Sequence, residues 1–156
     1  MSGILGGFAV SEKYTVKVIF LRQFVDLIIN LKTEIRYSQK PLYEILKSCS
    51  CGEPLRRYIN SCVSHLKEKC FEDSWKEAFA NLSKETGISK EKADVIINFG
   101  NELGSCDTQG QINYLEHNLN IIKTYLNEAI ENKKTKGNLP IVLGASLSLS
   151  IAILFI

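Results

Sequence analysis

Cysteine side chains are the first candidates for chemistry in this chain, which holds five of them among 156 residues. Cys49, Cys51, Cys62 and Cys70 would supply four thiolates to a tetrahedral zinc ion. The paired Cys-x-x-Cys knuckles of common zinc sites are absent, and Cys62 falls on the apolar face of its predicted helix. Because a free cysteine is often a small buried hydrophobe, the spacing favours reduced structural thiols, with a metal or thiol site as an alternative.

The two histidines offer no recognisable catalytic arrangement. His65 and His117 fall on different predicted helices, and neither stands in an HExxH or nucleophile motif. Phosphate-binding loops of the GxxxxGK[ST] and GxGxxG types are also absent from the sequence. We therefore expect a protein that is not an enzyme and that uses no cofactor, metal or small-molecule substrate.

Residues 80–103 resemble a DNA-binding helix-turn-helix, with Gly87 in the turn. The chain has 19 Lys and Arg against 17 Asp and Glu, a net charge of +2, which is less basic than a typical nucleic-acid-binding surface. The second helix of this segment, which would contact the DNA bases, carries both basic and acidic side chains. They are Lys90, Glu91, Lys92, Asp94 and Glu102. No nucleic-acid partner is expected, and a tail-anchored DNA-binding regulator is the alternative.

Apolar residues recur at spacings of three and four along most of the chain, which predicts an all-α fold. No stretch alternates like a strand, and no Asn-Gly or Asp-Gly hairpin turn occurs. We expect an antiparallel bundle of about six helices. The predicted helices span residues 14–36, 42–47, 53–66, 74–85, 89–103 and 107–134. Gly87 is expected to stop the fourth of them, and Ser89 to cap the fifth.

Helix ends carry several of the candidate structural positions. Ser74 and Glu77 have the spacing of a capping box, which would start a helix beside Trp75 and place that indole in the core. The block Leu103-Gly104 is expected to end one helix, with a left-handed Gly104. Asp107 is placed to cap the next helix, four residues before Gln111.

The last 18 residues, 139–156, contain no charge and would span about 27 Å as a helix, which predicts a transmembrane anchor. The lysines just before them are expected to stay in the cytoplasm, so that the C-terminus crosses the membrane. Small residues every four positions would allow this helix to pack closely in lipid. The lysines are Lys133, Lys134 and Lys136, and the small residues are Gly144, Ser148 and Ala152.

Three segments follow from these patterns. Residues 1–13 are an apolar N-terminal segment and a possible remnant of a first membrane anchor, residues 14–136 a cytoplasmic helical domain, and residues 139–156 the transmembrane helix.

The order of several short blocks resembles the stage III sporulation protein AB family of endospore-forming bacteria over about residues 8–156. The blocks that carry this resemblance are Glu34-Ile35-Arg36-Tyr37, Pro41-Leu42 with Glu44, Trp75 with Ala78, Phe99-Gly100-Asn101-Glu102-Leu103-Gly104, Asp107, Gln111 and Leu143-Gly144.

This resemblance implies a platform protein in the mother-cell membrane that faces the forespore. The family's helical domain is similar to the inner-membrane platform proteins of type II secretion and type IV pilus systems, which connect a cytoplasmic ATPase to a membrane assembly. The implied partners are the sporulation ATPase and the ring-forming channel proteins of the same operon, besides membrane lipid. The family brings no catalytic residue to this chain. Candidate structural or interface positions are Tyr37, Pro41, Leu42, Trp75, Leu103, Gly104, Asp107 and Gln111.

Overall fold

The structure, a computed structural model, describes residues 2–38, 40–103 and 107–137. Within these residues the chain is all-α, as the sequence predicts, and contains no strand. The helices are α1 (Ser2–Tyr37), α2 (Leu42–Ser48), α3 (Leu55–His65), α4 (Phe71–Ala78), α5 (Leu82–Thr86), α6 (Lys90–Glu102) and α7 (Thr108–Gly137).

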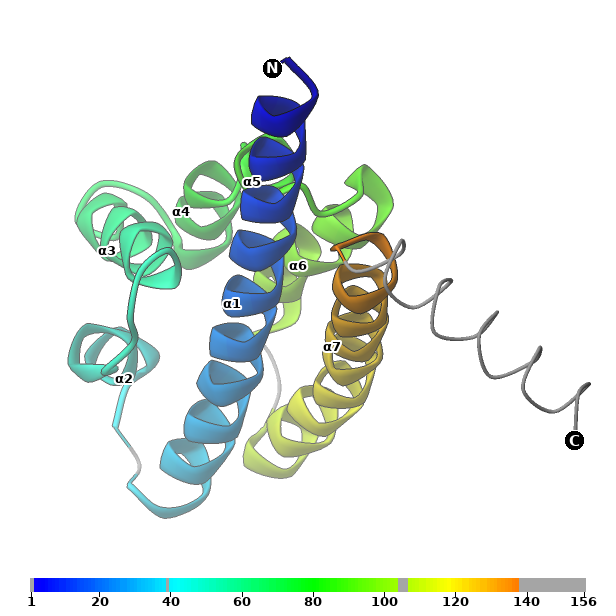
Figure 1. Cartoon of the computed structure of the whole chain (residues 1–156). Helices are drawn as coiled ribbons and strands as arrows, with labels where there is room; N and C mark the ends of the chain where they lie inside the picture. The colour runs from blue at the N-terminus through cyan, green and yellow to red at the C-terminus, as the bar shows by residue number, and fades with distance from the viewer. Residues whose placement is uncertain (1, 39, 104–106, 138–156) are drawn as a thin grey trace, which may run out of the picture.

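The two long helices, α1 and α7, pack along one another in opposite directions (Figure 1). Lys32 of α1 and Glu116 of α7 pair at 3.7 Å near one end of this arrangement. The shorter helices pack around the pair, with α3 against α4 and α4 against α6. The beginning of α1 and the end of α7 therefore share one end of the molecule. The end of α1 and the beginning of α7 share the other, which we call the hairpin end.

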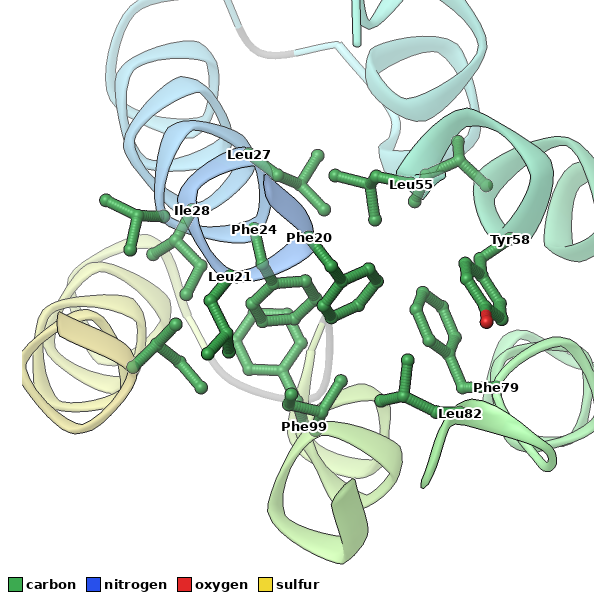
Figure 2. Packing of buried hydrophobic residues seen from close by; sticks show 14 of the residues in the cluster. Phe20, Leu21, Phe24, Leu27, Ile28, Leu55, Tyr58, Phe79, Leu82 and Phe99 are labelled. Atoms are coloured by element: carbon green, nitrogen blue, oxygen red, sulfur yellow. The ribbon is translucent and has the colours of Figure 1, made fainter. Parts of the chain in front are cut away.

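Aromatic rings fill the centre of the bundle (Figure 2). Phe20 and Phe24 of α1 are fully buried and point toward Phe79, which follows α4. Phe24 also meets Phe99 of α6 edge to face, with ring centroids 5.4 Å apart. Tyr58 of α3 stacks on Phe79 at 5.1 Å. Because large rings bury more area than any other side chain, this cluster joins α1, α3, α4 and α6 into one core.

Trp75 of α4 lies in the same core, as the sequence predicts, and is fully buried. Its indole stacks on Phe79 with centroids 4.3 Å apart, and its Nε1–H donates to the backbone oxygen of Ile96 at 3.0 Å. A methyl group at Gly100 would lie 2.4 Å from Cγ of this indole and 2.8 Å from its Cβ. Only glycine at position 100 therefore leaves room for the tryptophan against α6.

The predicted capping box at Ser74 is wrong. α4 begins at Phe71, with Cys70 in the N-cap position, and Ser74 lies inside the helix. The earlier start lets Phe71 contact Trp75 one turn later, with ring centroids 5.8 Å apart. Glu72 and Asp73 in the first turn also suit the positive end of the helix dipole.

The side chains of the supposed capping box have other surroundings. Ser74 is fully buried, and its hydroxyl has no hydrogen-bond partner among the described residues. Glu77 pairs instead with Lys69 and, at 3.6 Å, with His65. Ser74 and Glu77 therefore have the sequence spacing of a capping box but not its geometry, because Ser74 does not start the helix.

The helix predicted over residues 74–85 is in fact two helices, α4 and α5, so the described residues hold seven helices where about six were expected. The chain turns at Phe79, whose backbone oxygen accepts from the Leu82 N–H at 3.1 Å. Both side chains are fully buried, and burial of the two outweighs helix continuation through Ala80 and Asn81. The predicted stop at Gly87 is confirmed, because its φ is 78°, a left-handed conformation that suits glycine.

The outer parts of the chain complete the comparison with the sequence. Residues 2–13 form the first turns of α1, whereas the sequence predicted the first helix only from residue 14. Among the helices the structure describes, none combines the length and hydropathy that a bilayer span requires. The predicted membrane helix 139–156, with Gly144, Ser148 and Ala152, lies outside the described residues, as does Gly104.

Gly100→Ala should destabilise the domain by about 1–3 kcal/mol, because the added methyl group overlaps Trp75. Urea unfolding of the full chain, followed by circular dichroism, measures this change. Gly110→Ala, in the first turn of α7, is the matched helix glycine, where helix propensity predicts a gain of up to about 1 kcal/mol. Equal effects of the two substitutions would contradict the packing argument.

Ser74→Ala should stabilise the domain by about 1 kcal/mol, because it removes a buried hydroxyl that has no partner. Ser89→Ala is the control, since the Ser89 hydroxyl caps α6 by accepting from the Lys92 N–H, and its loss should cost about 1 kcal/mol. The same unfolding experiment compares both. A loss of stability in Ser74→Ala would contradict the assignment of this hydroxyl as a buried group without a partner.

Candidate functional site

Two blocks that are far apart in the sequence meet at the hairpin end of the molecule. Pro41 and Leu42 precede and begin α2, and Gln111 lies in the first turns of α7. All three line one pocket of about 460 Å³, which we call the hairpin-end pocket. Its other lining residues are Ile35, Lys40, Ile45 and Thr108.

The α1 side of this pocket is shaped by the turn between α1 and α2. The Ser38 hydroxyl donates to the Glu34 backbone oxygen at 2.8 Å and closes the last turn of α1. Pro41 is the N-cap residue of α2 in an extended conformation, one position before the first helical turn that its type suggested. Its backbone oxygen accepts from Glu44 and Ile45, so the proline starts the helix without needing an N–H of its own.

The α7 side is fixed by Asp107, which the sequence predicts as a helix cap. Its Oδ1 accepts from the Gly110 N–H at 3.0 Å, and its backbone oxygen accepts from the Gln111 N–H at 2.9 Å. The cap is thus confirmed, and it orients Thr108 and Gln111 at the pocket. Tyr114, one turn further on, stacks on Phe99 and donates to its backbone oxygen at 2.9 Å, which ties the start of α7 to α6.

The other candidate positions lie away from the pocket lining. Trp75 is in the core, and Leu103, next to the end of α6, is also buried. Tyr37, the last residue of α1, is 76% exposed. The candidates therefore separate into core residues and residues at the hairpin end.

Lys40 and Thr108 line the pocket but were not among the residues singled out from the sequence. Each is an immediate neighbour of a candidate, since Lys40 precedes Pro41 and Thr108 follows Asp107. Among the residues that the structure describes, no lining residue is acidic and the Lys40 ammonium has no carboxylate partner. The pocket thus combines an apolar floor with one cationic rim residue.

Cysteines line a second, smaller pocket of about 290 Å³ beside α1. Burial, reinforced by the adjacent Cys49 thiol, raises the pKa of Cys51 to about 11. Burial alone raises the pKa of Cys62 to about 12. Both groups are therefore protonated thiols at neutral pH, which disfavours nucleophilic attack by their sulfur atoms. Among the described residues, no three His, Cys, Asp or Glu side chains are placed to hold a metal ion.

The loop between α2 and α3, residues 49–54, has a structural role. The Gln23 side chain of α1 accepts from the Leu55 N–H at 3.2 Å and donates to the Glu53 backbone oxygen at 2.9 Å. Both bonds hold the start of α3 against α1. This role of Gln23 had no signal in the sequence pattern.

The helix-turn-helix segment serves as a corner of the bundle. Within α6, Ala93, Ile96 and Phe99 are buried in the core. Lys92, the central basic residue, pairs with Glu128 of α7 and lies over the Tyr125 ring, 5.1 Å from its centroid. The exposed charges of α6 are one lysine and three carboxylates, namely Lys90, Glu91, Asp94 and Glu102. This face would repel DNA phosphates.

Comparison with known proteins agrees with the resemblance of the sequence blocks. The family model described as Stage III sporulation protein AB matches residues 1–156, the whole chain. No curated protein and no solved structure matches the chain.

Asp107→Ala should lower the free energy of unfolding by about 1 kcal/mol, because the Gly110 N–H loses its acceptor. Asp107→Asn is the control, since an asparagine oxygen caps a helix about as well. Urea unfolding of the full chain distinguishes them. An unchanged stability in Asp107→Ala would mean that the cap does not contribute, and would leave Asp107 as a surface residue only.

Proposed function

The chain belongs to the stage III sporulation protein AB family, and we propose that it is a non-enzymatic membrane platform that couples a cytoplasmic ATPase to a secretion-like channel. Family membership gives it a role in sporulation. The proposed partners are the ATPase and the ring-forming channel proteins of the same operon. The proposed location is the mother-cell membrane that faces the forespore.

The antiparallel arrangement of α1 and α7 is the observation that carries this proposal. α7 has 30 residues, which corresponds to about 45 Å of helix. The end of α7 leads toward residues 139–156, while its beginning forms the hairpin-end pocket. An anchor at residues 139–156 would hold the pocket tens of ångströms away from the bilayer, within reach of a cytoplasmic partner.

The proposed anchor rests on the sequence of residues 139–156, which lie outside the described residues. Its 18 uncharged residues suffice for a short span, and Gly144, Ser148 and Ala152 would allow close packing with a neighbouring helix. The lysines before it favour a cytoplasmic helical domain, residues 14–136. Residues 2–13 begin α1 at the same end of the molecule, and the apolar N-terminal segment is proposed to approach the membrane there.

The non-enzymatic role is supported by the surroundings of the reactive side chains. Cys62 is fully buried in the core, where its thiol stays protonated. His65 is bound through Nδ1 to the Ser61 backbone oxygen at 2.7 Å and faces Glu77 on the other side. These groups stabilise helices and their contacts. The alternative of a DNA-binding regulator is disfavoured by the acidic exposed face of α6.

Purification of the tagged chain from sporulating membranes tests the proposal. The full chain should recover the ATPase and the channel proteins from the membrane fraction. A chain ending at Asn138 should leave that fraction on carbonate washing, because it lacks the proposed anchor. Recovery of neither partner by the full chain would overturn the platform role, and retention of the shortened chain would overturn the single anchor.

A further inference from the structure

The floor of the hairpin-end pocket is apolar. Ile45 is buried, while Ile35 and Leu42 are half-buried and pack against the core from its edge. The volume of about 460 Å³ lies in the usual range of ligand pockets, roughly 300–1,000 Å³. A bulky apolar side chain that entered this pocket would bury itself and the exposed parts of these residues.

The rim of the pocket is polar and carries one positive charge. Lys40 has no carboxylate partner within the described residues, whereas Lys32 pairs with Glu116 and Lys76 with Glu72. Thr108 contributes a hydroxyl group and Gln111 an amide. The Asp107 carboxylate is engaged in capping α7 and is not a lining group. An anionic group beside the apolar side chain of a ligand would therefore pair with the Lys40 ammonium, which no carboxylate of the described lining engages.

Two tyrosines near the pocket in the sequence are solvent-exposed. Tyr37 is 76% exposed at the end of α1, and Tyr43 of α2 is 37% exposed. Tyrosine is enriched at protein interfaces, and Tyr43 directly follows the lining residue Leu42 in the chain.

We propose that the hairpin-end pocket binds an acidic segment of a partner protein, with a bulky apolar side chain in the pocket and a carboxylate on Lys40. The identification of the ligand as a protein segment rests on the proposed platform function. The ligand chemistry itself rests on the apolar floor and on Lys40, which within the described part of the chain has no carboxylate partner and no acidic neighbour in the lining.

Fluorescence anisotropy with labelled peptides and the full chain in lipid nanodiscs tests this chemistry. The probe is the peptide Asp-Glu-Leu-Phe-Glu-Asp. The comparison peptides are Asn-Gln-Leu-Phe-Gln-Asn, which lacks the charges, and Asp-Glu-Ser-Ser-Glu-Asp, which lacks the apolar side chains. The probe should bind about tenfold more tightly than either, and its binding should weaken as salt is added.

Two pairs of variants locate the binding. Lys40→Glu should weaken binding of the probe about tenfold through charge reversal, while Lys84→Glu, at an exposed position of α5 outside the lining, should change it less than about twofold. Thr108→Trp should fill the pocket from an exposed position and abolish binding, while its neighbour Gln109→Trp should not. The melting temperature of each variant shows that it is folded.

Equal binding of the probe and the uncharged peptide, or unchanged binding in folded Lys40→Glu and Thr108→Trp, would overturn the proposal. Probe binding no tighter than that of the serine peptide would overturn it as well. The outcome is independent of the membrane purification. Partner recovery by the full chain without peptide binding would remove only the pocket inference, and peptide binding without partner recovery would remove only the platform role.

Discussion

The indole of Trp75 contacts the backbone of α6 at Gly100, where any side chain would overlap it. This contact fixes the position of α4 on α6. Because α4 also packs against α3, and α6 against α7, the contact restricts the positions of those helices as well. Phe24 of α1 touches the rings of Trp75, Phe79 and Phe99, so the longest helix is aligned by the same cluster. The positions of α4 and α6 relative to the α1–α7 pair thus depend on one glycine and one tryptophan.

The hairpin-end pocket exists because the two long helices extend past this aromatic cluster. Beyond Leu31, which is fully buried, α1 continues to Tyr37 with Ile35 only half-buried. α2 has seven residues and packs chiefly against α3, so it is too short to cover the space between the ends of α1 and α7. The core accordingly closes around the aromatic rings and leaves an apolar recess at its margin.

Helical periodicity and single-residue signals were enough to predict the all-α class, the Ser89 and Asp107 caps, the Gly87 stop and the burial of Trp75. The capping box at Ser74 failed because a local spacing cannot register that Phe71 gains a contact with Trp75 when the helix starts earlier. The pocket was not predictable as a unit. Lys40 and Thr108 come together only through the packing of α1 against α7, which no local pattern specifies.

Coupling between a cytoplasmic partner and the membrane requires a stiff connection, and the α1–α7 pair supplies it in the proposed role. A force applied at the hairpin-end pocket would act on the end of α1 and on the beginning of α7. Backbone hydrogen bonds, the Asp107 cap and the Lys32–Glu116 pair hold the residues there. Tyr114 then connects α7 to Phe99, and through Phe24 to α1. The force would therefore travel along packed helices toward residues 139–156, since the aromatic cluster prevents the two helices from sliding apart. In the proposed role, core residues such as Trp75 would keep the connection stiff, and residues at the hairpin end such as Pro41 and Gln111 would form the end to which a partner attaches.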